Sequence, residues 1–411
     1  MPHEESVIHE IDTMTGRRRL RIGIDGRVLM HYEIRGFARY TVELFRAMRE
    51  ILGHEIELYS FSPEPIASEF LAHFEIEPIV FQARREILWE QVELPKQLKS
   101  RNIDLFHATA NRGIPYRRVC KYVVTCHDII DRLPEFCGAE ESRVCWRKKY
   151  ADFVSRQRAD RYITVSNFSK QDIVRFHGVA PDRVTVIYNA ASPRFFDRVQ
   201  GERIGRTRSK YSLPQQYFLY LGGFDKRKNV GALIDAFAHL PNDAPPLVLA
   251  GEHKWDFACV AEKVNTLGLS NRVICPGVID DDDLPAIYRA ALALVHPSRY
   301  EGFGLQIVEA MASGLPVLAS ATTSLPEILG GSGLLFDPDS PISIAQQMQR
   351  ILAEPDLRTL LAANGQQRAR FFSWRETAEQ TLGLYRQLLG RNENTAYADE
   401  PALAAPGEQR R

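Results

Sequence analysis

The sequence predicts an α/β protein made of two Rossmann-like domains that face each other across a cleft. Its 411 residues are many for one domain and suit two. Strand-like apolar runs alternate with runs of helical periodicity, as in open parallel sheets covered by helices. Glycine-containing loops follow a strand at residues 26–36 and again at 222–223, so two halves each begin with a strand, a loop and a helix.

Composition narrows the class of protein. The chain is 45% hydrophobic and 25% charged, as in ordinary globular proteins, and its formal net charge of zero does not favour nucleic acid. No apolar run approaches the roughly 20 residues that span a bilayer. Residues 1–15 have neither the basic start nor the apolar core of a secretory signal. Six cysteines without a C-x-x-C pair are expected to be reduced thiols of a cytoplasmic protein.

The first half is predicted to hold an N-terminal extension, residues 1–19, and a domain over residues 20–200. Its loop with Gly36 lacks the spacing G-x-G-x-x-G, so a dinucleotide fingerprint fits poorly. Apolar runs predict strands at 20–25, 55–59, 103–106, 121–125, 162–165 and 184–188, and periodicity predicts helices at 40–48, near 89–98 and from 166.

The second half is predicted to be a domain over residues 201–370, after a polar linker between Pro193 and Pro214. Residues 371–390 form a further helix, and the polar, Ala/Pro-rich residues 391–411 are expected to be disordered. Apolar runs predict strands at 217–223, 247–250, 273–275 and 292–295, with helices at 230–240, 284–288 and from 305.

Two glutamates bracket the junction where the strand at 292–295 gives way to a helix. Glu301 lies in the loop, and Glu309 is the only acid on an apolar stretch of the helix, where a buried carboxylate needs hydrogen-bond donors. Gly302 and Gly304 allow close approach of a ligand to the backbone, and the first helical N–H groups are unpaired. Such a loop suits a polyhydroxylated or anionic ligand. Equally, Glu301 can be a solvated loop residue and Glu309 can lie on an exposed face.

Three further features have both a functional and a structural interpretation. His127 follows a strand, at the edge where parallel sheets bind ligands, yet a lone histidine there can be structural. The cations at 226–228 open a helix, where they oppose its dipole unless an anion such as a diphosphate binds; otherwise they form a solvated turn. The D-x-D pattern of Asp280–Asp283 precedes a helix and is interpreted as capping, so no essential metal is expected.

The segment Arg143–Arg161 contains seven cations, with Trp146, Tyr150 and Phe153 interleaved. It can be a solvated helix face that also packs an aromatic stripe. Alternatively, it is a basic amphipathic surface that meets anionic lipid headgroups or a lipid diphosphate acceptor, as in a peripheral membrane enzyme.

The spacing from Glu301 to Glu309, with Gly-Phe-Gly-Leu after the first acid and Ala-Met-Ala-Ser-Gly-Leu-Pro-Val after the second, resembles the E-x7-E motif of family 4 retaining glycosyltransferases. Further similarity runs from about Arg21 to Tyr385. The resemblance implies the GT-B fold, in which residues 20–200 form the acceptor domain and residues 201–370 the nucleotide-sugar domain, with the last helix crossing back onto the first domain. It also implies transfer of a hexose from a nucleoside diphosphate to a hydroxyl by same-face attack, with retained anomeric configuration.

The resemblance also assigns roles to residues. Glu309 would hold the ribose hydroxyls, and His127 would lie beside the anomeric carbon. The donor sugar would be held by Glu301 and by the backbone of Phe303, Gly304 and Leu305, the diphosphate by Lys228, and the nucleobase by the backbone of Pro276, Gly277 and Val278, with Gly36 facing the donor.

Two positions depart from the family pattern. A single glycine, Gly36, stands where the family usually has a pair, and Gly223 stands where an arginine is common, five residues before Lys228. We therefore expect Arg227 to supply the second phosphate contact. The catalytic residues are then His127, Glu301 and Lys228.

Two segments, Leu221–Asn229 with its proposed phosphate-binding cations and Trp89–Pro95, look most like bacterial mannosyltransferases of surface-polysaccharide (lipopolysaccharide) assembly. This favours GDP-mannose as donor and a glycan or lipid-linked acceptor, at the inner face of the cytoplasmic membrane. UDP-glucose and dTDP-rhamnose remain open. So do two other classes, a GT-B-like sugar-nucleotide epimerase, whose rate would not depend on an acceptor, and a non-catalytic partner subunit.

Overall fold

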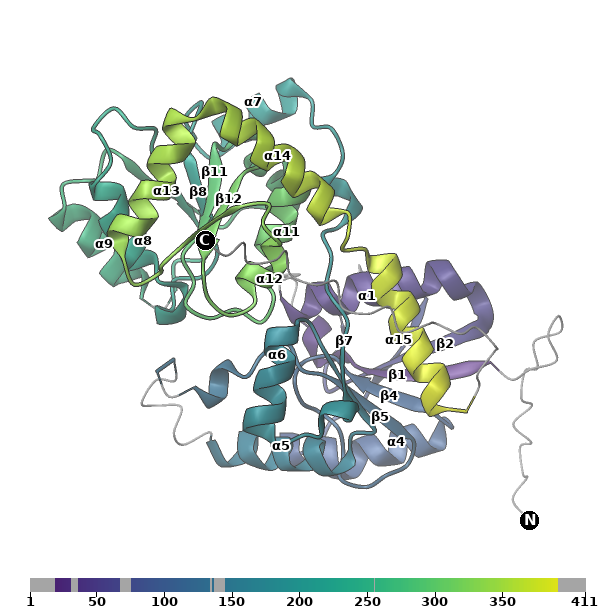
Figure 1. Cartoon of the computed structure of the whole chain (residues 1–411). Helices are drawn as coiled ribbons and strands as arrows, with labels where there is room; N and C mark the ends of the chain where they lie inside the picture. Colours follow the sequence, from purple (N-terminus) through teal and green to yellow (C-terminus); the bar gives the residue numbers. More distant parts are fainter. Residues whose placement is uncertain are drawn as a thin grey trace, which may run out of the picture.

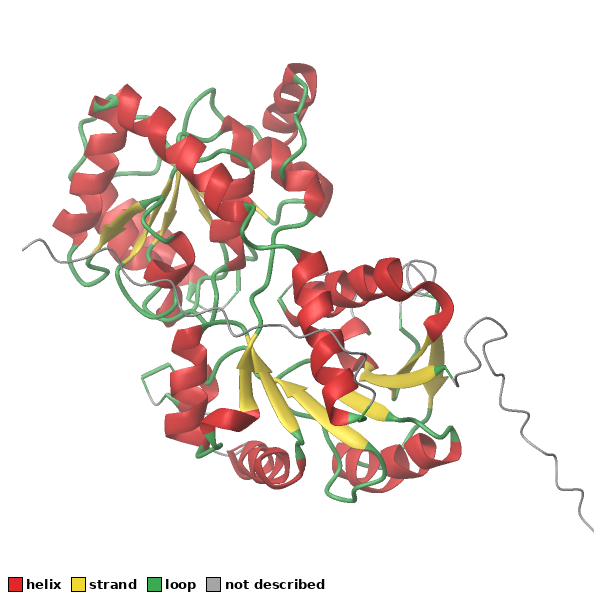
Figure 2. Ribbon diagram, turned by 45° about the vertical axis from the view of Figure 1, so that its right-hand side comes forward, coloured by secondary structure: helices red, strands yellow, loops and turns green. Residues whose placement is uncertain are grey.

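A computed structural model describes residues 19–30, 36–66, 75–133, 135–136, 145–254 and 256–390. Two separate parallel sheets, each flanked by helices, form the lower and upper lobes of the molecule (Figures 1 and 2). This confirms the predicted fold of two Rossmann-like α/β domains. Most of the predicted N-terminal extension, the whole C-terminal tail and Arg143 lie outside the described residues.

The first sheet has seven strands in the order β3-β2-β1-β4-β5-β6-β7. Its direction of growth reverses between β1 and β4, which makes their carboxyl ends a position where such sheets bind ligands. The strands are β1 (Leu20–Asp25), β2 (Ile56–Ser62), β3 (Ile76–Val80), β4 (Leu105–Ala108), β5 (Lys121–Thr125), β6 (Arg161–Thr164) and β7 (Val184–Val186).

The second sheet repeats this plan with six strands in the order β10-β9-β8-β11-β12-β13. The reversal here lies between β8 and β11. The strands are β8 (Phe218–Leu221), β9 (Leu247–Ala250), β10 (Val273–Gly277), β11 (Ala293–His296), β12 (Val317–Ser320) and β13 (Leu334–Phe336).

Helices cover the sheets and connect the lobes. Those of the first lobe include α1 (Phe37–Leu52), α3 (Glu86–Leu88), α4 (Leu94–Ser100), α5 (Cys145–Arg158) and α6 (Asn167–Asp172). The later ones are α7 (Gly201–Lys210), α8 (Val230–Ala238), α9 (Phe257–Thr266), α10 (Leu284–Ala290), α11 (Leu305–Ala312), α12 (Leu325–Leu329), α13 (Pro341–Ala353), α14 (Pro355–Ala369) and α15 (Trp374–Leu388).

Several elements are absent from the sequence prediction, among them β12, β13, α9, α13 and α14, and two others show why. Strand β3 was missed because it is an edge strand in which only Ile76 and Ile79 are buried, and its Pro78 is typical of an edge. Helix α7 occupies part of the predicted linker. It buries only Thr207, so its sequence carries no apolar periodicity, and it packs against α10.

Helix α15 returns from the second lobe to the first. In Figure 1 it lies across α1, with which it makes extensive contact, whereas the preceding α14 packs on α11. The hydroxyl of Tyr385 lies 2.6 Å from Nδ1 of His107, whose Nε2 lies 2.7 Å from the hydroxyl of Thr125. Burial, and then repulsion from the protonated form of His127, lower the pKa of His107 to about 3, so at neutral pH this ring is an uncharged link between α15 and the first sheet.

The substitution Tyr385→Phe removes one partner from this buried chain. Because a buried polar atom left without a partner costs about 1–3 kcal/mol, we expect the first lobe to lose roughly that much stability. Calorimetry would show a lower unfolding temperature. The control Tyr116→Phe changes a ring that is 42% exposed and should leave the temperature unchanged; equal behaviour of the two variants would contradict the prediction.

Candidate functional site

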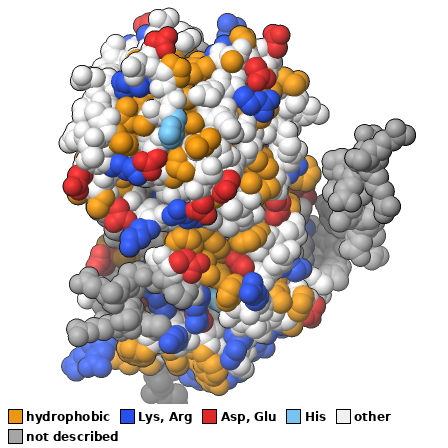
Figure 3. Space-filling view, turned by 60° about the vertical axis from the view of Figure 1, so that its left-hand side comes forward, with side chains coloured by type: hydrophobic (Ala, Val, Ile, Leu, Met, Phe, Trp, Pro, Cys, Tyr) orange, Lys and Arg blue, Asp and Glu red, His pale blue; other side chains and the backbone are white. Residues whose placement is uncertain are grey.

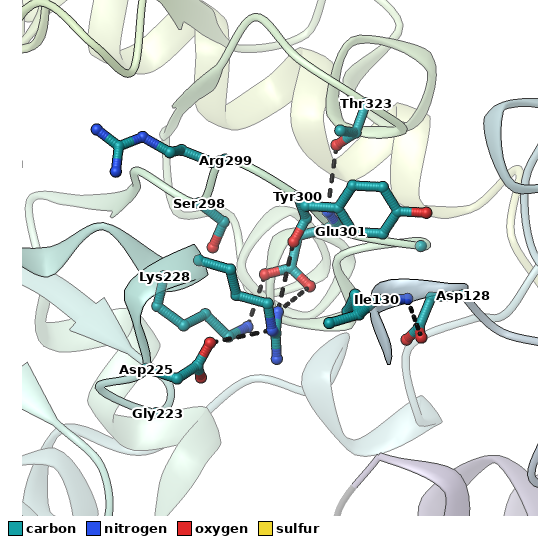
Figure 4. A network of polar contacts seen from close by, with 12 residues as sticks. Asp128, Ile130, Gly223, Asp225, Lys228, Ser298, Arg299, Tyr300, Glu301 and Thr323 are labelled. Atoms are coloured by element: carbon teal, nitrogen blue, oxygen red, sulfur yellow. Dashed lines mark hydrogen bonds and ion pairs between the residues drawn. The ribbon is translucent and has the colours of Figure 1, made fainter. Parts of the chain in front are cut away.

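A buried cluster of charges lies at the carboxyl ends of β8 and β11. The Glu301 carboxylate accepts from Lys228 Nζ at 2.6 Å and from Arg227 Nη1 at 3.2 Å. Arg227 Nε also lies 3.1 Å from a carboxylate oxygen of Asp225. Figure 4 shows Lys228 pointing at the carboxylate of Glu301 from the β8 side, while Thr323 bonds the backbone of Glu301 from the other side.

Backbone contacts fix the two segments that carry this cluster. Asn229 has the left-handed φ of 55° and donates through its side chain to Pro297 O and Pro338 O, at 3.2 and 2.7 Å. The backbone N–H of Arg299 bonds to Arg227 O at 2.7 Å. The turn after β8 is thereby held to the loop after β11.

Burial and charge act against each other in the cluster. Burial alone would raise the pKa of Glu301, but Lys228 and Arg227 bring it well below its usual value, so the carboxylate is ionised. Burial lowers the pKa of Lys228, against the opposing charge of Glu301. Because Glu301 is 8% exposed, the alternative of a solvated loop residue is wrong.

His296 is a member of the cluster that the sequence analysis missed. Its buried ring places Nε2 3.2 Å from Glu301 Oε1 and 3.2 Å from Ser298 Oγ. Burial lowers its pKa, so the neutral ring donates to Glu301. Its position at the end of β11, five residues before Glu301, was the available signal.

Glu309 lies inside α11, which begins after Gly304 with its left-handed φ of 90°. It is 4% exposed, so the alternative of an exposed helix face is also wrong. Tyr288 donates to Glu309 Oε2 at 2.9 Å. Burial raises the pKa of Glu309, and the charge of Arg39, from α1 of the other lobe, opposes this rise.

His127 faces the second lobe from the end of β5. Its Nε2 lies 2.9 Å from Thr109 O, so Nε2 carries the proton and Nδ1 the lone pair. Phe37 and Tyr40 of α1 pack on the ring at centroid distances of 4.8 and 4.7 Å. Burial lowers the pKa of His127 to about 4, which makes it neutral at neutral pH.

The two lobes touch beside these residues. Gly302 O accepts from Ser166 Oγ at 2.7 Å, and Ser169 Oγ lies 3.1 Å from the same oxygen. A Cβ at Gly302 would lie 2.1 Å from His127 O, so this approach requires glycine. Elsewhere along the boundary, Arg39 Nη2 lies 2.5 Å from Asp281 Oδ2, and Figure 3 shows acidic and basic side chains side by side where the lobes meet.

The remaining predicted residues frame this region. Gly36 precedes α1 with a φ of 50° and open space beside it. Phe303 is buried, and Leu305 begins α11. Pro276 and Gly277 end β10 and are followed by the exposed Val278; because β9 separates β10 from β8, they lie farther along the same sheet edge.

The capping interpretation of Asp280–Asp283 is wrong. No side-chain capping bond is made by Asp280 or Asp283, the residues that precede the two short helices there. Instead Lys210 Nζ lies 2.6 Å from a carboxylate oxygen of each, and Asp281 pairs with Arg39. These acids therefore bind Lys210 of α7 and Arg39 of the first lobe.

Helix α5 presents an outward stripe of alternating aromatic and basic residues. Trp146 is 62% exposed and Phe153 is 42% exposed, so these two rings do not pack as a core stripe. Lys149 and Arg156 are exposed between and beyond them. Within the described part of the chain, no helix has both the length and the apolarity needed to cross a membrane.

Comparison with known proteins adds to this geometry. Residues 34–195 match the family described as Glycosyltransferase Family 4, and residues 206–368 match glycosyl transferases group 1. The chain is 31% identical over 378 residues to O-antigen chain mannosyltransferase B of Escherichia coli, covering 87% of this chain and 97% of that protein. It is 32% identical over 301 residues to the serotype-specific mannosyltransferase WbdA of Escherichia coli, covering 71% of this chain and 36% of that longer protein.

Among solved structures, a glycosyltransferase from Rickettsia africae ESF-5 superposes with a TM-score of 0.74 at 19% identity, covering 91% of this chain and 100% of that one. At this identity the likeness concerns the fold.

Gly302→Ala tests the contact between the lobes. The new Cβ must move from 2.1 Å to the 3.4 Å at which ordinary contact begins, so the loops separate by about 1 Å or more. We expect solution scattering to show a larger radius of gyration than in the wild type. Gly205→Ala, at a glycine with open space around it, is the control; identical curves for all three proteins would contradict the prediction.

Proposed function

Because the chain belongs to the family 4 glycosyltransferases, we propose that it transfers a mannosyl residue from GDP-mannose to a hydroxyl of a glycan or lipid-linked acceptor in surface-polysaccharide assembly. Mannose is favoured because both Escherichia coli relatives are named mannosyltransferases, and one is matched over nearly its whole length. We also propose that the transferred sugar keeps its anomeric configuration in the product.

The observation that carries this proposal is the convergence of Lys228 and Arg227 on one buried carboxylate, at the sheet edge where ligands bind. A leaving diphosphate develops negative charge, and fixed cations that meet it lower the barrier. Lys228 uses one of its three N–H donors on Glu301, and Arg227 Nη2 makes no hydrogen bond to any described residue. Both side chains can therefore reach a phosphate while they orient Glu301 toward the sugar hydroxyls.

Glu309 is proposed to hold the ribose. Tyr288 occupies only Oε2, and no hydrogen bond to Oε1 is present within the described residues. A vicinal diol can supply donors to a carboxylate that burial would otherwise leave poorly solvated. The charge of Arg39, a residue of the first lobe, acts on Glu309. The first lobe would therefore also lie beside the ribose of the donor.

His127 is proposed to contact the donor sugar near its anomeric carbon as a neutral ring. Because its pKa is lowered, the ring is uncharged at neutral pH. Its Nε2–H is bonded to Thr109 O, so Nδ1 is the atom that can accept a hydrogen bond. The acceptor proton would then pass to the leaving phosphate, which suits same-face attack. We further propose that the reaction needs no metal and occurs at the cytoplasmic face of the membrane, where the outward stripe of α5 would meet anionic lipid.

Donor binding can be tested by thermal shift with GDP, UDP and dTDP. A nucleotide at 100 times its dissociation constant stabilises by about 2.7 kcal/mol. We expect a GDP-selective shift that is lost in Glu309→Ala, and affinity for GDP at least about threefold weaker in Arg227→Ala, because a charge-assisted hydrogen bond is removed. Glu202→Ala, on the exposed surface of α7, is the control.

The nucleotide that binds decides between the alternatives. A shift with UDP or dTDP alone would overturn GDP-mannose and keep the transferase. Absence of any shift would favour a non-catalytic partner subunit. If Arg227→Ala binds GDP with unchanged affinity, Arg227 does not contact the phosphates.

A further inference from the structure

Tyr300, the residue before Glu301, belongs to the second lobe in sequence but packs inside the first. It lies in the loop after β11, yet it is 5% exposed and forms part of an apolar cluster of the first lobe. Among the described residues, every other buried member of that cluster lies between Phe61 and Val184. Phe168 of α6 packs on the ring edge-to-face, at a centroid distance of 5.7 Å. The side chain of Tyr300 therefore joins the two lobes.

The hydroxyl of Tyr300 has a hydrogen-bond partner in the first lobe. It donates over 2.6 Å to Oδ2 of Asp172, the last residue of α6, and both side chains are buried. Burial, and then the bond to Asp172, raise the pKa of Tyr300, while a backbone hydrogen bond from Ile129 opposes this rise. The hydroxyl therefore keeps its proton at neutral pH and acts as the donor. Because a buried donor without a partner is costly, the contact favours one position of this side chain.

Tyr300 and Glu301 point in opposite directions from the same loop. In Figure 4 the carboxylate of Glu301 is directed toward Lys228. The ring of Tyr300 is directed to the other side, where Asp128 lies. Asp128 directly follows His127 in the chain. The loop that carries Glu301 thus reaches the segment that carries His127 through the side chain of Tyr300.

Both neighbours of Glu301 in the chain are bound to α6. The preceding residue, Tyr300, bonds to the end of this helix, and Gly302 O, from the following residue, lies 3.1 Å from Ser169 Oγ. The same Ser169 Oγ lies 3.2 Å from His127 O. Helix α6 therefore sets the distance between the loop of Glu301 and the loop of His127, which belong to different lobes.

We propose that Tyr300 is a positioning residue for the transfer reaction, and that its bond to Asp172 fixes Glu301 of the second lobe relative to His127 of the first. The inference rests on the proposed function, in which the donor sugar lies between Glu301 and His127. Reacting groups misplaced by about 1 Å can lower a rate by as much as about a hundredfold. Loss of the bond is therefore expected to slow transfer. The proposed contacts to the diphosphate and the ribose come from the second lobe, so nucleotide affinity is expected to stay unchanged.

The test compares variants of Tyr300 and Asp172 in the full chain, with GDP-mannose as donor and a mannose disaccharide as acceptor. Tyr300→Phe keeps the ring and loses only the hydroxyl, and Asp172→Ala removes the acceptor of its hydrogen bond. We expect each to lower kcat by about tenfold or more, with unchanged affinity for GDP in calorimetry. The double variant should be no slower than the slower single variant, because both substitutions remove the same hydrogen bond.

Asp172→Asn is the conservative variant, because its amide oxygen can still accept from Tyr300, and it should keep kcat near that of the wild type. Asp182→Asn makes the same change at an exposed carboxylate of the first lobe and is the matched control. Wild-type kcat in Tyr300→Phe, or Asp172→Asn as slow as Asp172→Ala, overturns the inference. A loss of GDP affinity as large as the loss of kcat also overturns it, because Tyr300 would then act through the nucleotide contacts.

Amide hydrogen exchange of Ile129 separates this inference from the proposed function, because it needs no transfer reaction. The backbone of Ile129 makes a hydrogen bond to the Tyr300 hydroxyl, so Tyr300→Phe should exchange faster at this amide, and Asp182→Asn should exchange like the wild type. Faster exchange in Tyr300→Phe, together with no mannose transfer by the wild type, supports the contact between the lobes while the donor assignment fails. Unchanged exchange at Ile129 in Tyr300→Phe overturns the inference whatever the rate of transfer.

Discussion

The buried contact between Glu301 and Lys228 joins the two strand ends on which the second lobe builds its site. Two charges removed from water are costly unless each is paired and hydrogen-bonded, and removal of one partner leaves the other stranded. Here Arg227 and His296 supply further donors to Glu301, and Asn229 holds the turn that carries Lys228. Glu301 is therefore held by several partners, which fixes the position of its charge.

The same constraint extends to the contact between lobes. Gly302 directly follows Glu301, and its carbonyl is bonded by serine hydroxyls of the first lobe while its Cα lies against His127. The position of Glu301 thus depends on how the lobes meet. Helix α15, which follows the second lobe in the chain, is bound to the first lobe through the contact of Tyr385 with His107. The contact between the lobes and the geometry of the site are consequently linked by residues a few bonds apart.

Those parts of the fold and of the candidate site that depend on residues close together in the sequence could be predicted. The bounds of β1 were predicted from its alternating pattern and those of β5 and β9 from short apolar runs, and the fold class follows from the alternation of strands with helices. The mannosyltransferase resemblance rested on the segments Leu221–Asn229 and Trp89–Pro95, and the names of the relatives support it. The burial of Glu301 and Glu309 decided between interpretations that the sequence left open.

The features that the sequence did not predict depend on contacts between residues that are far apart in the chain. Asp280–Asp283 precede a helix, and acids there are common as caps; their true partners, Lys210 and Arg39, lie about 70 and 240 positions away. The sequence assigned Lys228 and Glu301 to parts of one ligand, but nothing in it indicated that they bond to each other. A cavity at the carboxyl ends of β1 and β4 is lined by four separate segments, so no single motif marks it.

The most direct measurement is the anomeric configuration of the product formed from GDP-mannose and a mannose disaccharide, followed by proton NMR. The account predicts an α-linked mannose on the disaccharide, formed only when the acceptor is present. A β-linked product would contradict retention, and free mannose or an altered sugar nucleotide formed without acceptor would contradict the transfer itself.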